Sequence, residues 1–184
     1  MLYDVTQNPE EYNKVLKDFK IKPVIKKLTR VENKLIWKKY LEEKKHLEYI
    51  TGETIKELNL FHGTRAHDPS GVYQYKEEAF NINYSSERNY FGRGIYFAQE
   101  ASYSKRYAYP SGSAPQRTIL FCRVLVGTSQ EMEDHQRSGD IVDTEYRDAS
   151  RKIKYESIHS NYDGSDIYIV YKSRRAYPEY VIEF

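Results

Sequence analysis

The sequence contains a single cysteine, Cys122, among its 184 residues. One thiol excludes an internal disulfide and a cysteine-rich zinc site, so a metal centre would depend on the five histidines, and we expect none. No apolar run is long enough for a membrane span or a signal-peptide core, and the N-terminus is polar. These absences predict a reducing, intracellular location, in the cytoplasm or nucleus, and no membrane partner.

A large excess of either charge is also missing. Lys and Arg number 29 and Asp and Glu 27, so the net charge is +2, which offers no general attraction to nucleic acid or to an anionic membrane. The length suits one domain with one buried core, and we expect residues 1–184 to form it. Tyrosine is abundant instead, with 19 residues. Its flat ring with a polar tip suits strand faces and ring-binding pockets.

The N-terminal part carries the signals of a helix. Asn8 can cap it, Pro9 suits the first helical position, and Glu11 completes a capping box. Pro23 is expected to end the helix, and a strand is expected over residues 24–31. The apolar residues that recur at helical spacing are Tyr12, Val15, Leu16 and Phe19.

A second helix is predicted from about Asn33 to about Glu48, with Trp37 on its flank. Its Lys and Glu residues indicate a solvated face, and their mixed signs argue against a nucleic-acid patch. The side chains expected to face the core are Leu35, Ile36, Tyr40, Leu41 and Leu47.

The remainder of the chain is dominated by short strands. A strand over 55–61 precedes a long polar connection, 65–90, which is more often functional than idle in a compact domain. Residues 101–107 should be helical, 110–116 a loop, and 129–140 a charged surface loop. Further strands are expected at 118–126, 141–144, 155–159, 166–171 and 177–184, with a turn at Asp163-Gly164. Two helices followed by many short strands predict an α+β fold with a mainly antiparallel sheet.

His62 and Gly63 follow the strand 55–61 directly. A histidine beside a glycine at a strand end is usually a packing or capping residue. The functional alternative is that the imidazole grips a ribose hydroxyl, while the glycine leaves its backbone N–H and C=O open to a ligand.

Gly92-Arg93-Gly94 invites a dinucleotide-binding interpretation, which we reject. The third glycine of the GxGxxG fingerprint is replaced by Phe97, and the intervening residues favour a strand over a helix start. The glycines mark either a bulge or hairpin corner, or a strand that approaches a ligand closely.

Ser104 lies three residues before Tyr107, so a helix would place the hydroxyl and the ring on one face. Together with Tyr96 and the backbone of Gly63, they would suit an aromatic ligand that carries a carboxamide. Core packing is the alternative for Tyr107, and hydrogen bonding back to the helix is the alternative for Ser104.

The combination resembles the catalytic domain of the poly(ADP-ribose) polymerase (PARP) family of diphtheria-toxin-like ADP-ribosyltransferases. The HGT run at residues 62–64 is similar to the family motif HG[ST], and FGRGIYFA at 91–98 is similar to [FY]GxGxYFA. Ser104 and Tyr107 fall where the family places its nicotinamide-binding serine and stacking tyrosine. Two further stretches, residues 33–40 and the closing AYPEYVIEF, also resemble this domain, so the likeness covers essentially the whole chain.

The resemblance implies a split antiparallel sheet with flanking helices and NAD as substrate. The cofactor-binding residues it implies are His62, Gly63, Thr64, Tyr96, Ser104 and Tyr107. In the family's polymerases the catalytic triad is His–Tyr–Glu, and His62 and Tyr96 match its first two members. Ile167 occupies the glutamate position, which favours a His–Tyr–Ile mono-ADP-ribosyltransferase.

Two acids lie close to that position in the sequence. Asp166 is one residue out of register, so a strand would turn it to the opposite face, and Glu179 belongs to a later strand. Without an enzyme carboxylate, the acceptor would bring its own nucleophile. A protein side chain is expected first, with an RNA or DNA end as the other option.

The alternative to a transferase is an inactive binding module with the same fold. The connection 65–90 is expected to cap the NAD site and the excursion 129–140 to shape acceptor access. Within that connection, Arg65, His67 and Asp68 either reach the adenosine ribose and the phosphates or lie in a solvated loop.

Overall fold

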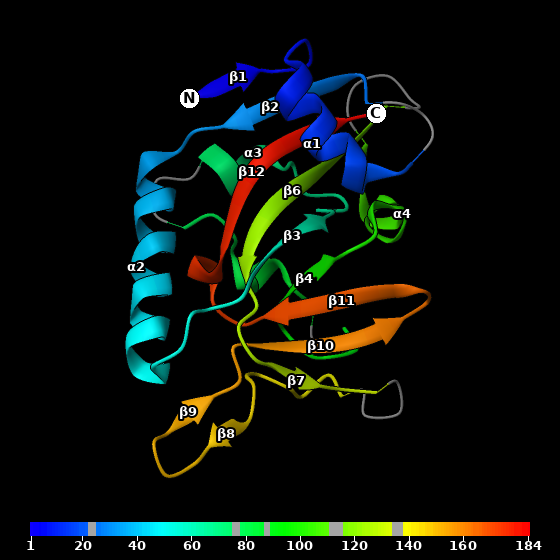
Figure 1. Ribbon diagram of the computed structural model, residues 1–184. Coiled ribbons are helices and arrows are strands. Elements are labelled where there is room, and N and C mark those ends of the chain that lie inside the picture. Colours follow the sequence, from blue (N-terminus) through cyan, green and yellow to red (C-terminus); the bar gives the residue numbers. More distant parts are fainter. Residues whose placement is uncertain (22–24, 75–77, 87–88, 111–115, 134–137) are drawn as a thin grey trace.

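The computed structural model describes residues 1–21, 25–74, 78–86, 89–110, 116–133 and 138–184 (Figure 1). Its main sheet has ten strands, in the order β1-β2-β12-β6-β3-β4-β11-β10-β7, with β5 paired to β6. The strands are β1 (Leu2–Asp4), β2 (Lys27–Val31), β3 (Glu57–His62), β4 (Ile95–Ala98), β5 (Tyr109–Pro110), β6 (Arg117–Leu125), β7 (Ser129–Glu131), β10 (Ser157–Tyr162), β11 (Ser165–Val170) and β12 (Ala176–Glu183). A separate hairpin contains β8 (Tyr146–Asp148) and β9 (Ile153–Lys154).

The helices in the described part of the chain are α1 (Pro9–Phe19), α2 (Lys34–Thr51), α3 (Ser70–Gln74) and α4 (Ala101–Ser104), with 3-10 turns η1 (Ile82–Tyr84), η2 (Lys105–Tyr107) and η4 (Ser173–Arg175). Of these, α2 is the longest. None of the helices in the described ranges is both long and apolar enough to cross a membrane. Among the residues that the structure describes, every strand pair is antiparallel except β7 with β10, so the predicted α+β class with a mainly antiparallel sheet is confirmed.

Helix α1 begins as predicted, but one detail of its cap was wrong. The side-chain oxygen of Asn8 accepts hydrogen bonds from the backbone N–H groups of Glu10 (3.1 Å) and Glu11 (3.3 Å), and Pro9 starts the helix. The carboxylate of Glu11 does not return to the Asn8 backbone. It accepts from the Asn8 side-chain amide at 3.1 Å and pairs with Arg30 at 2.6 Å, because a tertiary cation competes with the capping box.

The far end and the apolar face of α1 follow the pattern in part. The helix ends at Phe19, with Lys20 in the left-handed conformation at φ 42°, and Pro23 lies outside the described residues. Val15 and Phe19 are buried, whereas Leu16 is exposed because it lies at the edge of the apolar stripe.

Helix α2 is capped by Asn33 and ends three residues later than predicted, at Thr51 before Gly52 (φ 75°). It runs along one side of the sheet in Figure 1. Ile36, Tyr40 and Leu47 face the core, but Leu35 is 44% exposed, so its predicted burial was wrong. Its position in the first turn, beside the cap, turns it away from the sheet.

The strand predicted at 141–144 was wrong. Thr144 instead donates its hydroxyl hydrogen to the Tyr155 carbonyl at 2.6 Å, and Asp143 pairs with Lys154 at 2.7 Å. These side-chain bonds replace strand pairing there, and the β8–β9 hairpin follows. The predicted surface loop 129–140 was also partly wrong, because its first residues form β7, and β1 was not predicted.

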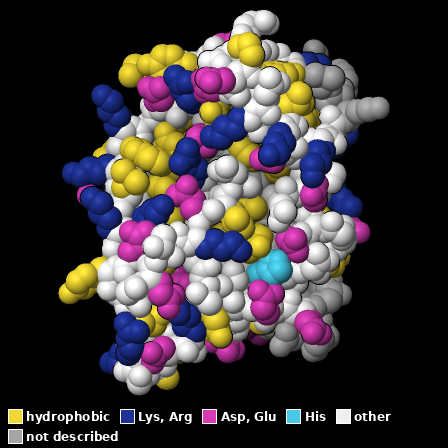
Figure 2. Space-filling model, viewed as in Figure 1, with side chains coloured by type: hydrophobic (Ala, Val, Ile, Leu, Met, Phe, Trp, Pro, Cys, Tyr) yellow, Lys and Arg dark blue, Asp and Glu magenta, His cyan; other side chains and the backbone are white. Residues whose placement is uncertain are grey.

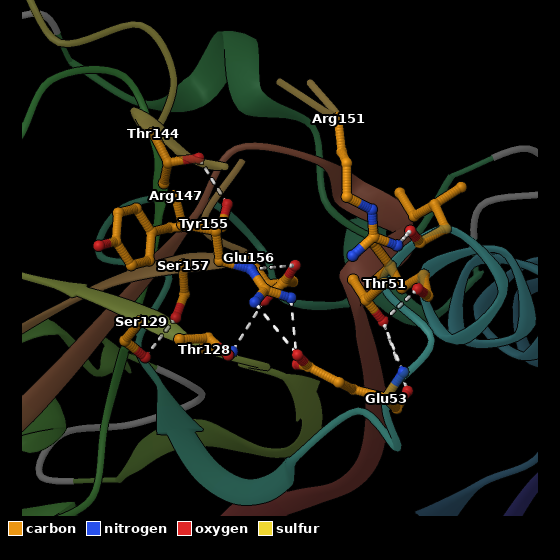
Figure 3. Close-up of polar contacts among 12 residues, drawn as sticks. Thr51, Glu53, Thr128, Ser129, Thr144, Arg147, Arg151, Tyr155, Glu156 and Ser157 are labelled. Carbon is orange, nitrogen blue, oxygen red and sulfur yellow. Dashed lines mark hydrogen bonds and ion pairs between the residues drawn. The ribbon is translucent and has the colours of Figure 1, made fainter. Parts of the chain in front are cut away.

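Polar contacts attach the β8–β9 hairpin to the body of the protein (Figure 3). Glu156 is 1% exposed and accepts from the Thr128 N–H at 2.8 Å, while its other oxygen lies 3.8 Å from Arg147 Nε. Arg147 also pairs with Glu53 at 3.1 Å, just beyond the end of α2. A Cβ at Gly127 would lie 2.5 Å from the Glu156 carboxylate, so only glycine lets the backbone pass this close to that side chain.

The sheet is nearly divided between β3 and β4. These strands pair only at Phe61 and Ala98, whereas β3 pairs with β6 at six positions and β4 with β11 at four. In Figure 1, β10 and β11 run across the molecule while β6 and β12 run steeply. The split antiparallel sheet that the resemblance implies is therefore present, and the ends of β3 and β4 diverge from a single pair.

Charge on the face shown in Figure 2 is mixed, with Lys and Arg side chains interspersed among Asp and Glu. This surface agrees with the net charge of +2. It gives no reason to assign this face to nucleic acid.

Candidate active site

A pocket of about 1120 Å³ lies where β3 and β4 diverge. Its walls come from the end of β3, the connection 65–90, β4, the α4–η2 segment and β11. Ligand pockets usually occupy about 300–1000 Å³, so this one has room for a dinucleotide. All of the sequence-predicted site residues line it, namely His62, Gly63, Thr64, Tyr96, Ser104, Tyr107 and Ile167.

His62 is the last residue of β3, and its Nδ1 lies 2.7 Å from the Tyr96 carbonyl oxygen. A carbonyl only accepts, so Nδ1 carries the hydrogen. The imidazole contacts the rings of Phe80 at 5.2 Å and Phe97 at 5.3 Å between centroids. Burial in this aromatic surrounding lowers the His62 pKa below its usual value, so the ring is neutral at pH 7 and Nε2 is an acceptor.

Position 63 requires glycine because the backbone of the α4–η2 segment passes close to it. A Cβ there would lie 2.4 Å from the Tyr107 carbonyl oxygen and 2.8 Å from that of Ser104. Any side chain would push the end of β3 away from the α4–η2 segment. Ser104 itself is buried, and its hydroxyl has no hydrogen-bond partner among the described residues. Thr64, in contrast, donates its hydroxyl hydrogen to the His67 carbonyl at 2.6 Å and so shapes the next turn.

The Tyr96 hydroxyl is fully engaged with the backbone. It accepts from the Phe91 N–H at 2.9 Å and donates to the Gly92 carbonyl at 2.9 Å. Burial raises the Tyr96 pKa well above its usual value, so the phenol keeps its proton near pH 7. The ring lines the pocket while the hydroxyl holds the turn that precedes β4.

The glycines of this turn serve the protein's own packing. A Cβ at Gly92, which has φ 68°, would lie 1.7 Å from the Ile141 carbonyl oxygen. A Cβ at Gly94 would lie 2.1 Å from the Ile169 side chain. The corner interpretation of these glycines therefore accounts for both.

Tyr107 ends η2, and its ring contacts Arg65 and Tyr103. The Arg65 guanidinium carbon lies 4.6 Å from the ring centroid, and the Tyr103 ring is 5.6 Å away. The Arg65 backbone N–H also donates to the Tyr107 carbonyl at 2.7 Å. The predicted helix over 101–107 is α-helical only to Ser104, after which the chain tightens into the 3-10 turn.

Ile167 is paired with Ala98 and lines the pocket, and the alternation of β11 turns Asp166 away from it. Asp166 accepts from Asn161 at 2.9 Å and lies 3.2 Å from His159. The Asn161 hydrogen bond, with help from His159, holds the Asp166 pKa below its usual value.

Glu179 is also distant from the pocket chemistry. It pairs with Arg123 at 2.9 Å and Lys14 at 3.2 Å and does not line the pocket. Of the lining residues that the structure describes, only Asp68 and Glu78 carry carboxylates.

Some lining residues were not predicted from the sequence. Phe80 lies within the polar connection, where no periodic pattern marks it. Tyr103 had no feature in the sequence that distinguished it from the other tyrosines, of which the chain has 19 in all. His67 and Tyr84 stack at 4.7 Å between ring centroids, which joins two parts of the connection beside the pocket. Arg65 and Asp68, which were left open between a ligand role and a solvated loop, both line the pocket.

The chain is similar to known proteins over nearly its whole length. The model of the poly(ADP-ribose) polymerase catalytic domain matches residues 7–184. A probable poly [ADP-ribose] polymerase of Dictyostelium discoideum is 32% identical over 162 residues, which cover 86% of this chain and 43% of that protein. The human protein mono-ADP-ribosyltransferases PARP14 (30% identical, 87% of this chain, 9% of that protein) and PARP12 (27%, 98% and 25%) are also similar. The chain thus spans less than half the length of these relatives.

Proposed function

The chain belongs to the poly(ADP-ribose) polymerase catalytic-domain family, and from that premise we propose that it transfers a single ADP-ribose unit from NAD to an acceptor and releases nicotinamide. Residues 1–184 act as one catalytic domain in this proposal. The observation that carries it is the meeting of His62, Ser104 and Tyr107 around one large pocket. Ile167, which the resemblance puts at the position of the polymerase glutamate, lines the same pocket.

The pocket groups match the parts of NAD. The Gly63 backbone and the Ser104 hydroxyl, which no other described residue engages, hold the carboxamide, and the Tyr107 ring stacks on the nicotinamide. His62 Nε2 accepts a hydrogen bond from a ribose hydroxyl, since Nδ1 is committed to the Tyr96 carbonyl. No metal takes part.

The reaction breaks the bond between nicotinamide and ribose. The bonding electron pair moves to the nicotinamide nitrogen, which becomes neutral, and positive charge develops on the ribose as in glycoside cleavage. The acceptor nucleophile then attacks the anomeric carbon. A ring–cation contact contributes about 0.5–2 kcal/mol and favours the charged ground state, so Tyr107 binds and orients the ring. The barrier is lowered by positioning of the ribose, in which His62 is the main contact.

The acceptor supplies its own nucleophile in this mechanism. Ile167 offers no carboxylate to activate a ribose hydroxyl, so chain elongation is not expected. We favour an acidic protein side chain, with the terminal phosphate of an RNA or DNA end as the second class. The excursion 129–140 contributes to acceptor access, because the N–H of its residue Ser138 donates to the carbonyl of pocket-lining Tyr90 at 2.9 Å. We place the activity inside the cell, where the buried free Cys122 stays reduced.

Labelled NAD offered to protein and RNA acceptors tests the proposal. His62→Ala should abolish transfer, whereas His46→Ala, an exposed change on α2, should leave it intact. Intact-mass analysis should show single ADP-ribose additions. A ladder of repeated units would refute the role given to Ile167, and wild-type labelling by His62→Ala would refute the mechanism.

The same materials separate a transferase from an inactive binding module. Binding of a benzamide should raise the melting temperature in either case, because ligand binding stabilises the native state. Only the transferase releases nicotinamide from NAD.

A further inference from the structure

Arg65 is directed at Tyr107 by both its backbone and its side chain. Its N–H donates to the Tyr107 carbonyl at 2.7 Å, and its guanidinium carbon lies 4.6 Å from the Tyr107 ring centroid. The residue adopts φ 54°, a left-handed conformation that side chains other than Asn, Asp and Gly rarely take. The Arg65 guanidinium therefore lies against the ring that, in the proposed function, stacks on a planar cationic heterocycle.

The charges of the pocket give Arg65 a second potential partner. NAD carries a diphosphate with two negative charges. Among the described residues that line the pocket, Arg65 is the only Lys or Arg, while Asp68 and Glu78 are acidic. The Arg65 side chain is exposed and makes no ion pair within the described parts of the chain, so packing does not fix it in place.

We propose that Arg65 determines specificity for the whole dinucleotide: it covers the Tyr107 ring in the empty pocket and leaves it for the diphosphate when NAD binds. This inference rests on the proposed function, because it takes Tyr107 as the nicotinamide platform. A guanidinium suits both partners, since it stacks on aromatic faces and binds phosphate oxygens through paired N–H groups.

The consequence is a preference between ligands of the same ring. A neutral nicotinamide or benzamide must displace the guanidinium from Tyr107 and carries no anionic group that could bind it. A dinucleotide displaces it too, but its diphosphate accepts the released cation. Arg65 thus weakens fragment binding and strengthens dinucleotide binding, which helps the neutral product nicotinamide to leave.

Calorimetric titration with two neutral-ring ligands tests this inference. One is 3-aminobenzamide, and the other is benzamide adenine dinucleotide, which carries the diphosphate and is not cleaved. Arg65→Ala should bind 3-aminobenzamide about two- to fivefold more tightly, because the competing ring contact is lost. The same variant should bind the dinucleotide about fivefold more weakly, because the phosphate partner is lost.

A matched control is available in Arg106, whose guanidinium lies 5.4 Å from the Tyr103 ring but which does not line the pocket. Arg106→Ala should leave both affinities unchanged. Arg65→Lys keeps the charge without the planar stack and should retain most of the dinucleotide affinity. Arg65→Asn, which tolerates the left-handed backbone, takes the place of the alanine variant if the latter unfolds on melting analysis.

Opposite shifts for the two ligands support the role of Arg65. The proposal is overturned if Arg65→Ala changes the affinities for both ligands equally in one direction, or changes neither affinity. Arg65 would then not exchange the Tyr107 ring for the diphosphate. Failure of the proposed function has a different signature. In that case wild-type protein binds neither ligand, or His62→Ala binds the dinucleotide as wild type does.

Discussion

Replacing Tyr96 by phenylalanine separates a structural hydroxyl from a catalytic one. The ring that lines the pocket stays, while the Phe91 N–H and the Gly92 carbonyl each lose a partner at 2.9 Å. A buried group left without a hydrogen bond costs about 1–3 kcal/mol. The Gly92 carbonyl still accepts from the Gly94 N–H at 3.0 Å, so only the Phe91 N–H is left unpaired; we take the middle of this range and expect a loss of about 2 kcal/mol in total.

For a chain of this length, each kcal/mol shifts the melting temperature by about 2–4 °C, so Tyr96→Phe should melt about 4–8 °C lower. Urea unfolding should show a lower midpoint with an unchanged slope. Tyr49→Phe is the matched control, because Tyr49 is 87% exposed, and its melting temperature should not move.

The kinetic arm gives the refuting result. With the ring in place, the rate constant for nicotinamide release should change little below the melting range. If the phenol were a general acid or base, its loss would lower that rate constant by roughly 100-fold or more. A variant as stable as wild type with such a loss of rate would show that the Tyr96 hydroxyl takes part in the chemistry.

Three further predictions concern packing and charge. Gly63→Ala should abolish benzamide binding, measured by thermal shift, because its Cβ would lie 2.4 Å from the Tyr107 carbonyl oxygen. Gly52→Ala is the control: it strains the end of α2 at φ 75° and lowers the melting temperature, but it lies away from the pocket and should leave the benzamide-induced shift intact. Glu156→Gln should lower the free energy of unfolding by about 1–3 kcal/mol in urea titrations, because Arg147 would keep only the exposed Glu53 as an ionic partner. An unchanged urea midpoint would contradict the network in Figure 3. The lowered pKa of His62 means that the unfolded chain binds its proton first as pH falls, so the stability from this residue is present above about pH 6.5 and is lost below it. His62→Gln should flatten that acid slope in melting curves, and an unaltered slope would show that His62 titrates normally.

Local patterns in the sequence were sufficient where neighbours in the chain decide the structure. The alternation of β11 correctly separated Ile167 from Asp166, because a strand turns successive side chains to opposite faces. The cap at Asn8 was predictable for the same reason, since its side chain bonds the backbone two and three residues on.

Long-range contacts decided the parts that the sequence did not predict. Glu11 leaves its capping box for Arg30, which is 19 residues away. The segment 141–144 is apolar enough for a strand, but Gly92 packs against the Ile141 carbonyl and Thr144 bonds Tyr155. Such partners are set by the tertiary fold, which no window of sequence contains.

The single residue pair between β3 and β4 explains why the site lies where it does. A continuous ladder would bury the backbone beyond Phe61 and Ala98 and leave no space for a ligand. Once the strands diverge, the chain must satisfy those backbone groups in another way, and the His62 imidazole does so by donating to the Tyr96 carbonyl at 2.7 Å. The same bond fixes the tautomer, so Nε2 is the acceptor available to the pocket. In this arrangement, one histidine both bridges the split in the sheet and presents the ribose contact that the proposed transfer requires.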